Sequence, residues 1–313
     1  MEQSLNEEKT PSKLWNVVRW IPFGLMVLSA LVLIGMMLTG GMVKITGWYL
    51  MQLVPPILGG VTLITIVIYA IIRRRMSKAW IATGMASLLS LSPLILWFSP
   101  VAYPASLEKT NPAVTIRLPT DVPLRVAWGG DSIKTNYHAA APDQRWAYDL
   151  VVEPYFSGSA NLEDYGCYGV PVVAPIDGLV ISAHDGEPDE VPGILSNNFT
   201  APTGNHVMIR IEETGTYLVI AHLKNGSVAV RTGDTVEEGQ TIGECGNSGN
   251  TSEPHIHIHH QRQDPTEFPL NFAEGLPLYF RDHDGPPMPV GGFRIEEETI
   301  IIAEGDIVQH KGR

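Results

Sequence analysis

Three long stretches without a charged residue constrain the fold of this chain most. They contain the apolar spans 21–38, 48–72 and 79–98. Each span has close to the roughly 20 residues that a helix needs to cross a bilayer. Pro55 and Pro56 interrupt the second span, and a membrane helix tolerates them only with local repair of its backbone hydrogen bonds. We therefore expect three transmembrane α-helices.

The basic residues predict the orientation of these helices. Lys9, Lys13 and Arg19 precede the first span, and 73–78 holds four basic residues between the second and third, whereas the remaining short loop has only Lys44. Cytoplasmic loops carry the excess of Lys and Arg. The sequence thus predicts a multi-pass protein of the cell membrane with a cytoplasmic N-terminus (1–20), an anchor (21–99) and an extracytoplasmic remainder.

The predicted exported part is strongly acidic. Residues 1–99 contain eight of the 21 Lys and Arg residues and three of the 33 Asp and Glu residues, which leaves 13 basic and 30 acidic residues and a formal charge near −17. Such a charge argues against a nucleic-acid partner. Both cysteines, Cys167 and Cys245, also lie in this part. A disulfide persists in an exported domain, and the residues leave open whether one forms or both thiols stay free.

The pattern of the exported part is that of an all-β domain. From Val114 to Asn271, short apolar runs alternate with Gly, Pro, Asn and Asp, and no long stretch has a helical period. We expect an antiparallel sheet with a barrel-sandwich-like core, and hairpins over 170–181 and 207–220. The polar segment 185–204 is predicted to be a long loop that walls a binding cleft.

Two histidines in one strand indicate a metal site. Side chains at i and i+2 of a strand point to the same face, so His255 and His257 can reach one ion while Ile256 lies behind them. Asp149 lies in the strand-like run 145–152, where a buried carboxylate is costly unless it is paired or bound to a cation. Asp143 is the alternative, although Pro142 places it in a turn.

An ordered set of motifs over residues 130–265 resembles the lysostaphin/LytM-type zinc metallopeptidase family. The motifs are His138 with Asp149, Ala221-His222-Leu223, Gly246-Asn247-Ser248-Gly249-Asn250 and Pro254-His255-Ile256-His257. The resemblance implies a peptidase domain over 130–271, preceded by a linker with the first strands (100–129) and followed by a Pro-rich, acidic C-terminal extension (272–313). It also implies hydrolysis of peptide bonds in bacterial peptidoglycan.

The resemblance also assigns roles to residues. It implies that His138, Asp149 and His257 bind Zn²⁺ with one position left for water, and that His222 and His255 are catalytic. The commonest form of the family has three residues between the first histidine and the aspartate, whereas ten separate them here. We therefore expect residues 139–144 to bulge out.

Four further polar residues receive weaker expectations. His259 is predicted to be a strand-end histidine in water, and His206 to line the cleft as a substrate contact. Asn136 and Asn205 are either substrate contacts or buried turn-forming asparagines.

The expected partners are a peptidoglycan peptide and membrane lipid, with partner proteins of the membrane or wall left open. One alternative is a non-hydrolytic module that binds peptidoglycan or activates other hydrolases. A second is a biotinyl- or lipoyl-like carrier domain, which the Val-x-x-Gly-Asp-x-Val-x-x-Gly-Gln pattern of residues 230–240 resembles. Such a carrier needs a lysine in an exposed hairpin turn, and Lys224 lies beside the Ala-His-Leu motif instead.

Overall fold

The structure of the chain is a computed structural model. The structure describes residues 12–74, 76–269, 271–296 and 300–312, so most of the predicted cytoplasmic N-terminus lies outside the described residues. The chain divides into two compact units, Met1–Pro100 and Val101–Arg313.

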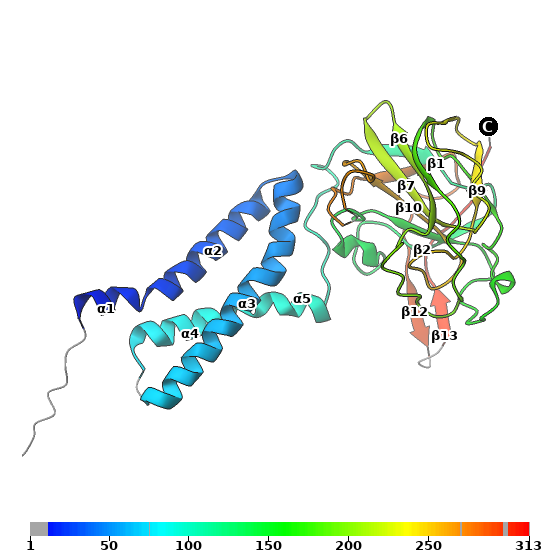
Figure 1. Ribbon diagram of the computed structural model, residues 1–313. Helices are drawn as coiled ribbons and strands as arrows, with labels where there is room; N and C mark the ends of the chain where they lie inside the picture. The colour runs from blue at the N-terminus through cyan, green and yellow to red at the C-terminus, as the bar shows by residue number, and fades with distance from the viewer. Residues whose placement is uncertain (1–11, 75, 270, 297–299, 313) are drawn as a thin grey trace, which may run out of the picture. The chain divides into compact units, whose positions relative to one another are not determined.

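The first unit is helical (Figure 1). Its elements are α1 (Lys13–Val18), α2 (Ile21–Leu38), α3 (Gly41–Arg73), α4 (Lys78–Ser90), the 3-10 turn η1 (Ser92–Leu94) and α5 (Ile95–Phe98). The second span begins seven residues earlier than predicted, at Gly41, and continues through both prolines. The third is interrupted at η1, where Pro93 has no backbone N–H to continue an α-helix.

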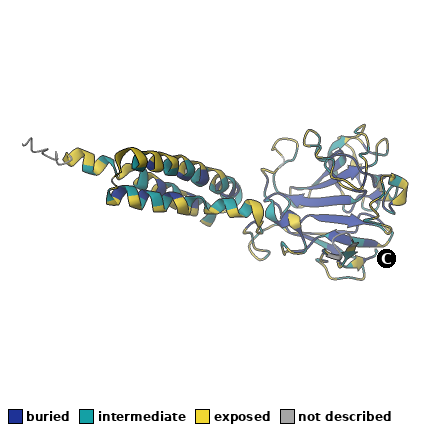
Figure 2. Cartoon of the chain, turned by 90° about the horizontal axis from the view of Figure 1, so that it is seen from below, coloured by how far each residue is buried: buried dark blue, intermediate teal, exposed yellow. Residues whose placement is uncertain are grey.

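The outer surfaces of these helices are apolar. Figure 2 shows exposed residues along them, and Leu25, Leu28, Ile57 and Ile64 are among the exposed side chains. Three helical segments are long and apolar enough to cross a membrane. Close packing inside the unit relies on a small residue, since a Cβ on Gly59 would lie 2.1 Å from Ser90 Oγ. Three long apolar helices therefore precede the β unit, as predicted.

An eight-stranded antiparallel sheet dominates the second unit. Its order from edge to edge is β14 (Ile307–Val308), β2 (Leu124–Trp128), β3 (Tyr148–Val151), β10 (Ile256–Gln261), β7 (Thr216–Leu223), β6 (Asn205–Ile211), β5 (Gly178–His184) and β8 (Thr235–Val236). Smaller two-stranded sheets pair β1 (Val114–Arg117) with β11 (Leu278–Arg281), β4 (Pro171–Val173) with β9 (Thr241–Glu244), and β12 (Phe293–Glu296) with β13 (Ile300–Ala303). The all-β prediction is confirmed.

One of the two predicted hairpins is present. β6 and β7 pair across a turn at Gly215, whose φ is +66°. The hairpin over 170–181 was wrong, because β4 pairs with β9, whereas β5 pairs with β6 and β8. The apolar pattern of 170–181 suits both a hairpin and two strands in different sheets. Val172 of β4 and Val180 of β5 pack into the same core although they belong to different sheets.

The core is formed by alternate residues of the central strands. β6 contributes Val207, Ile209 and Ile211, and β10 contributes Ile256 and Ile258. Burying side chains of this kind supplies the main favourable term in folding. The strands of the β unit are accordingly buried in Figure 2.

The C-terminal extension is part of the β unit. β14 pairs with β2 and closes one edge of the large sheet, and β11 pairs in parallel with β1. Its Pro-rich composition suggested a tail, whereas Leu278, Phe280 and Val308 belong to the core. Apolar residues from beyond 271 thus complete the fold.

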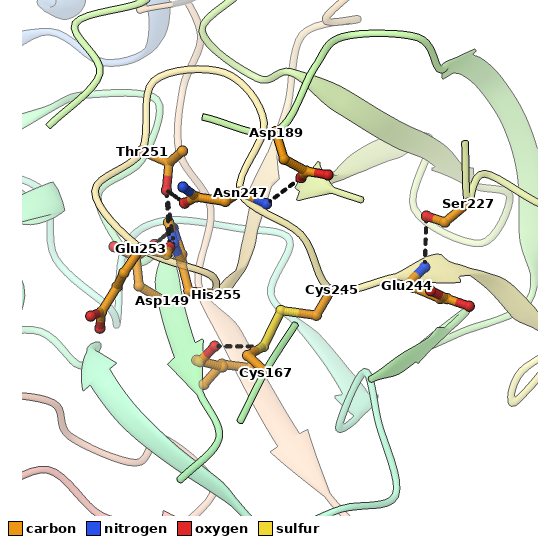
Figure 3. Close-up of a disulfide and its surroundings, with 11 residues drawn as sticks. Asp149, Cys167, Asp189, Ser227, Glu244, Cys245, Asn247, Thr251, Glu253 and His255 are labelled. Atoms are coloured by element: carbon orange, nitrogen blue, oxygen red, sulfur yellow. Dashed lines mark hydrogen bonds and ion pairs between the residues drawn. A yellow bond between two sulfur atoms is a disulfide. The ribbon is translucent and has the colours of Figure 1, made fainter. Parts of the chain in front are cut away.

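Cys167 and Cys245 form a disulfide within the core (Figure 3). It joins the segment before β4 to the residue that follows β9. The question that the sequence left open is answered in favour of the disulfide.

Replacing both cysteines with alanine should lower the free energy of unfolding of the β unit. The cross-linked residues are 78 positions apart. Closing a loop of that length lowers the conformational entropy of the unfolded chain, which stabilises the folded state by about 4 kcal/mol. Pulse proteolysis across a urea titration of the full chain in detergent, detected by a C-terminal tag, measures the change. A reducing agent should destabilise the wild type and leave the variant unchanged. Equal midpoints for the two proteins would contradict the expectation.

His260 should make this unit sensitive to acid. It follows Ile256 and Ile258 on the core face, where its ring contacts Thr216 Oγ1 at 2.7 Å and the Pro277 carbonyl at 3.2 Å. Burial lowers the pKa of His260 to about 3. Above pH 6.5 the ring is neutral in both folded and unfolded chains, and below it only the unfolded chain gains the proton. Stability is therefore lost as the pH falls.

Between pH 8 and pH 5 this one group should cost about 2 kcal/mol of stability. We expect His260→Gln, which can retain both hydrogen bonds, to lose correspondingly less stability than the wild type over the same pH range. The same proteolysis assay at the two pH values checks this. Parallel losses in both proteins would show that His260 does not control the acid sensitivity.

Candidate metal centre

Strands β3 and β10 bring an aspartate and a histidine together. The two strands are antiparallel neighbours, and Asp149 pairs directly with His257 in their register. Tyr148 and Leu150 on β3 face the core, as do Ile256 and Ile258 on β10. Strand alternation therefore turns Asp149 and His257 to the opposite face of the sheet.

His138 reaches this face from the short 3-10 helix η2 (Tyr137–Ala140). Asn136 Oδ1 accepts the His138 backbone N–H at 3.2 Å, and Asn136 Nδ2 donates to the carbonyls of Gly130 and Ala147. Asn136 is fully buried. Of the two readings left open by the sequence, these bonds favour the turn-forming asparagine.

The donor atoms of three residues converge. His138 Nε2 lies 2.9 Å from Asp149 Oδ2, and His257 Nδ1 lies 2.8 Å from Asp149 Oδ1. One ligand atom from each residue lies within 4.8 Å of the others. Two imidazoles and one carboxylate form a donor set suited to a catalytic zinc ion.

Hydrogen bonds along β10 orient His257 for this role. Gln261 Nε2 donates to the Gln263 carbonyl, so Gln261 Oε1 is left to accept from His259 Nε2 at 3.0 Å. His259 Nδ1 must then accept from His257 Nε2, which is 2.9 Å away. This tautomer leaves the lone pair of His257 Nδ1 directed to the site.

The protonation states also suit a metal. Burial lowers the pKa of His257 to about 3, although the Asp149 carboxylate opposes this effect. Burial disfavours the charge on Asp149, but His138 and His255 outweigh it and hold the pKa of that carboxyl well below its usual range. A neutral imidazole and an ionised carboxylate are the forms that bind a metal.

A β-bulge in β7 places His222 beside this set. The register with β6 shifts between the pairs Val207–Ile220 and Asn205–Leu223, so β7 carries one extra residue. His222 has φ +63°, which costs a non-glycine residue roughly 1 kcal/mol. Ile220 and Leu223 both enter the core, and the kink lets His222 leave that face.

His222 and His255 present the same ring nitrogen to the cleft. His222 Nδ1 donates to the Ser248 carbonyl and His255 Nδ1 donates to the Glu253 carbonyl, each at 2.8 Å. Their ring centroids are 4.8 Å apart, and His255 Nε2 lies 3.6 Å from Asp149 Oδ1. Burial lowers the pKa of His222 well below its ordinary value. His222 is therefore a neutral imidazole whose Nε2 can accept a proton.

The connection between His138 and Asp149 is packed inside the unit, so the expectation that residues 139–144 bulge out was wrong. Ala139 and Asp143 are fully buried, because the main chain at Asn271 and Gly275 covers the segment by donating to Asp143 Oδ2 and to the Pro142 carbonyl. Asp143 is not among the grouped ligand atoms. The structure thus brings Asp149, rather than the alternative Asp143, to His138 and His257.

Two other histidines differ from their expected places. His259 is buried, because β10 is a central strand of the sheet and not a strand end in water. His206 does not line the cleft. Its Nε2 contacts Ser182 Oγ at 3.1 Å, and its ring stacks on His184.

Asn205 has a structural environment as well. It is fully buried and exchanges hydrogen bonds with the main chain of Glu187, and its amide also donates to the Leu223 carbonyl. These contacts favour the second reading of this residue, that of a buried asparagine.

A cleft of about 730 Å³ contains the proposed ligands and both proposed catalytic histidines. Leu195, Phe199, Pro202 and Thr203 form part of its wall, which confirms the prediction for the loop 185–204. Sequence reasoning missed several further lining residues, among them Trp128, Tyr137, Phe156 and Glu253. Of these, only Tyr137 carried a signal, since it directly precedes His138; its hydroxyl donates to Asp149 Oδ2 at 3.3 Å.

Several solved structures resemble parts of this chain. The catalytic domain of the antimicrobial peptidase lysostaphin from Staphylococcus simulans is 22% identical with a TM-score of 0.26, over 39% of this chain and 76% of that one. A mutant catalytic domain of the prophage-encoded M23 protein EnpA from Enterococcus faecalis is 18% identical with a TM-score of 0.28, over 42% and 73%. A zinc-containing peptidase from Vibrio cholerae is 21% identical with a TM-score of 0.25, over 36% of this chain and only 26% of its own length.

A protein-family model matches the part of the chain that contains three of the five site residues. Residues 163–268 match Peptidase family M23. This segment contains His222, His255 and His257, whereas His138 and Asp149 precede it. The family resemblance expected from the motifs is confirmed, and the β unit therefore contains a domain of peptidase family M23.

Proposed function

We propose that this chain is a membrane-anchored zinc endopeptidase that hydrolyses peptide bonds of bacterial peptidoglycan. The observation that carries the proposal is that His138, Asp149 and His257 each place one ligand atom within 4.8 Å of the others, in the cleft of an M23 domain. His138, Asp149 and His257 would hold Zn²⁺. When bound, the ion would polarise a peptide carbonyl and lower the pKa of a bound water.

His222 and His255 would take part in transferring the proton of the attacking water. His222 Nε2 has no proton in the neutral tautomer and can accept one from the attacking water. The protonated ring can then donate to the amide nitrogen that leaves. The Glu253 carbonyl accepts the Nδ1 proton of His255, so His255 Nε2 would donate a hydrogen bond to the developing oxyanion when the ring is protonated and would share in the proton transfer when it is neutral. Tyr137 stays protonated, since burial raises its pKa, and holds Asp149 through its hydroxyl.

The proposed location is outside the cytoplasm. Three apolar helices suit contact with membrane lipid, and basic residues around them favour a cytoplasmic N-terminus. The disulfide is consistent with an oxidising compartment. A β unit tethered on that side of the membrane would face the cell wall and its peptides. Tethering would then keep the enzyme close to its substrate, which its acidic surface would not do by charge attraction.

His257→Ala and His222→Ala should separate metal binding from proton transfer. We expect His257→Ala to lose both zinc and hydrolysis, because it removes a ligand. His222→Ala should keep zinc and lose about 10²–10⁴-fold in rate, the usual contribution of a general base. Zinc is measured by elemental mass spectrometry on the full chain in detergent, and hydrolysis by mass analysis of fragments released from cross-linked peptidoglycan.

His184→Ala is the matched control, because His184 is an exposed histidine outside the cleft. This variant should keep both zinc and activity. Equal hydrolysis by all four proteins would refute the assignment of the site. Bound zinc without hydrolysis of any wall preparation would instead support the non-hydrolytic binding or activating module.

A further inference from the structure

Glu253 is a buried carboxylate in the wall of the cleft. It lies two residues before His255 in the segment that joins β9 to β10, and its exposed fraction is 7%. It lines the same cleft as the metal centre. Figure 3 shows its side chain beside Asp149 and His255.

Only one oxygen of this carboxylate has a partner. Glu253 Oε2 accepts the backbone N–H of Phe156 at 3.0 Å. Oε1 is buried and has no hydrogen-bond partner among the described residues, and no Lys or Arg of that part of the chain forms an ion pair with Glu253. A buried carboxylate oxygen without a partner is costly.

The main chain of Glu253 explains the position of His255 but not the choice of a glutamate. The Glu253 carbonyl accepts from Thr251 Oγ1 at 3.0 Å and from His255 Nδ1 at 2.8 Å. Any residue could supply that carbonyl. The bond to Phe156 needs a single acceptor oxygen, which a neutral glutamine would also provide. The second carboxylate oxygen has no hydrogen-bond partner among the described residues.

The surroundings favour a cation at this point. Burial raises the pKa of Glu253 to about 7, so a positive charge beside it would restore the ionised form. Phe156, Leu195 and Phe199 line the cleft with apolar surface, which strengthens a charge interaction by excluding water. The acidic exported part, with a formal charge near −17, attracts cations in general.

We propose that the carboxylate of Glu253, which lines the cleft, recognises an ammonium group on the peptide substrate. The inference rests on the proposed peptidase function and names the substrate class: a wall peptide that carries a free amine near the bond to be cut. The amine can be the α-amino group at a peptide end or the side-chain amine of a diamino acid. Both sources offer the same chemistry to the carboxylate.

Three pentapeptides distinguish the two sources of the amine. The first has blocked ends and a central lysine, the second has blocked ends and a central norleucine, and the third is the norleucine peptide with a free amino terminus. Their Kd values are measured by isothermal titration on the zinc-loaded full chain in detergent. Wild type should bind one amine peptide at least about 10-fold more tightly than the neutral peptide, as a charge-assisted hydrogen bond implies.

Glu253→Gln should reduce that preference to less than about two-fold while keeping the bond to Phe156. Glu237→Gln removes the same charge from an exposed turn residue and should leave the preference unchanged. No preference in the wild type, or an undiminished preference in Glu253→Gln, overturns the proposal. A Glu253-dependent preference without cleavage of any peptide or wall preparation would refute the proposed hydrolysis and leave the ammonium subsite standing.

Discussion

The pairing of Asp149 with His257 across β3 and β10 is the constraint on which the site depends. Putting an ionised carboxylate inside a β unit is costly, and the surrounding imidazoles offset that cost. The two strands lie at the centre of the eight-stranded sheet, so their spacing is fixed by ladders on both sides. A rigid central pair of strands gives the donor atoms positions that loops alone would not hold.

The sequence predicted most of the structural features that depend on hydrophobic periodicity and on the distribution of charge. Spans free of charge predicted the helices, and strand alternation at His255 and His257 predicted a shared face. Prediction from the sequence failed where the pairing or burial of a segment depends on contacts with residues distant in the chain. The same apolar run serves a hairpin or two separate sheets, so the partner of β4 could not be inferred. Nothing local showed that Asn271 and Gly275 cover the segment at Pro142 and Asp143.

The site shows the same division. Histidines in register stand out in a sequence because their spacing matches the strand period. Glu253, Phe156 and Trp128 meet in the cleft from separate stretches of chain, and none has a spacing that marks it. His259 was misplaced for a related reason, since the burial of a strand residue depends on neighbouring segments, here β7, rather than on the strand itself.

The left-handed residue in β7 has a consequence for how this fold can vary. By interrupting the alternation once, it separates position 222 from the packing that holds Ile220 and Leu223. A replacement of His222 thus changes the chemistry of the cleft without creating a cavity in the hydrophobic core. Reactivity and structural integrity can consequently diverge under selection at adjacent positions of a single strand.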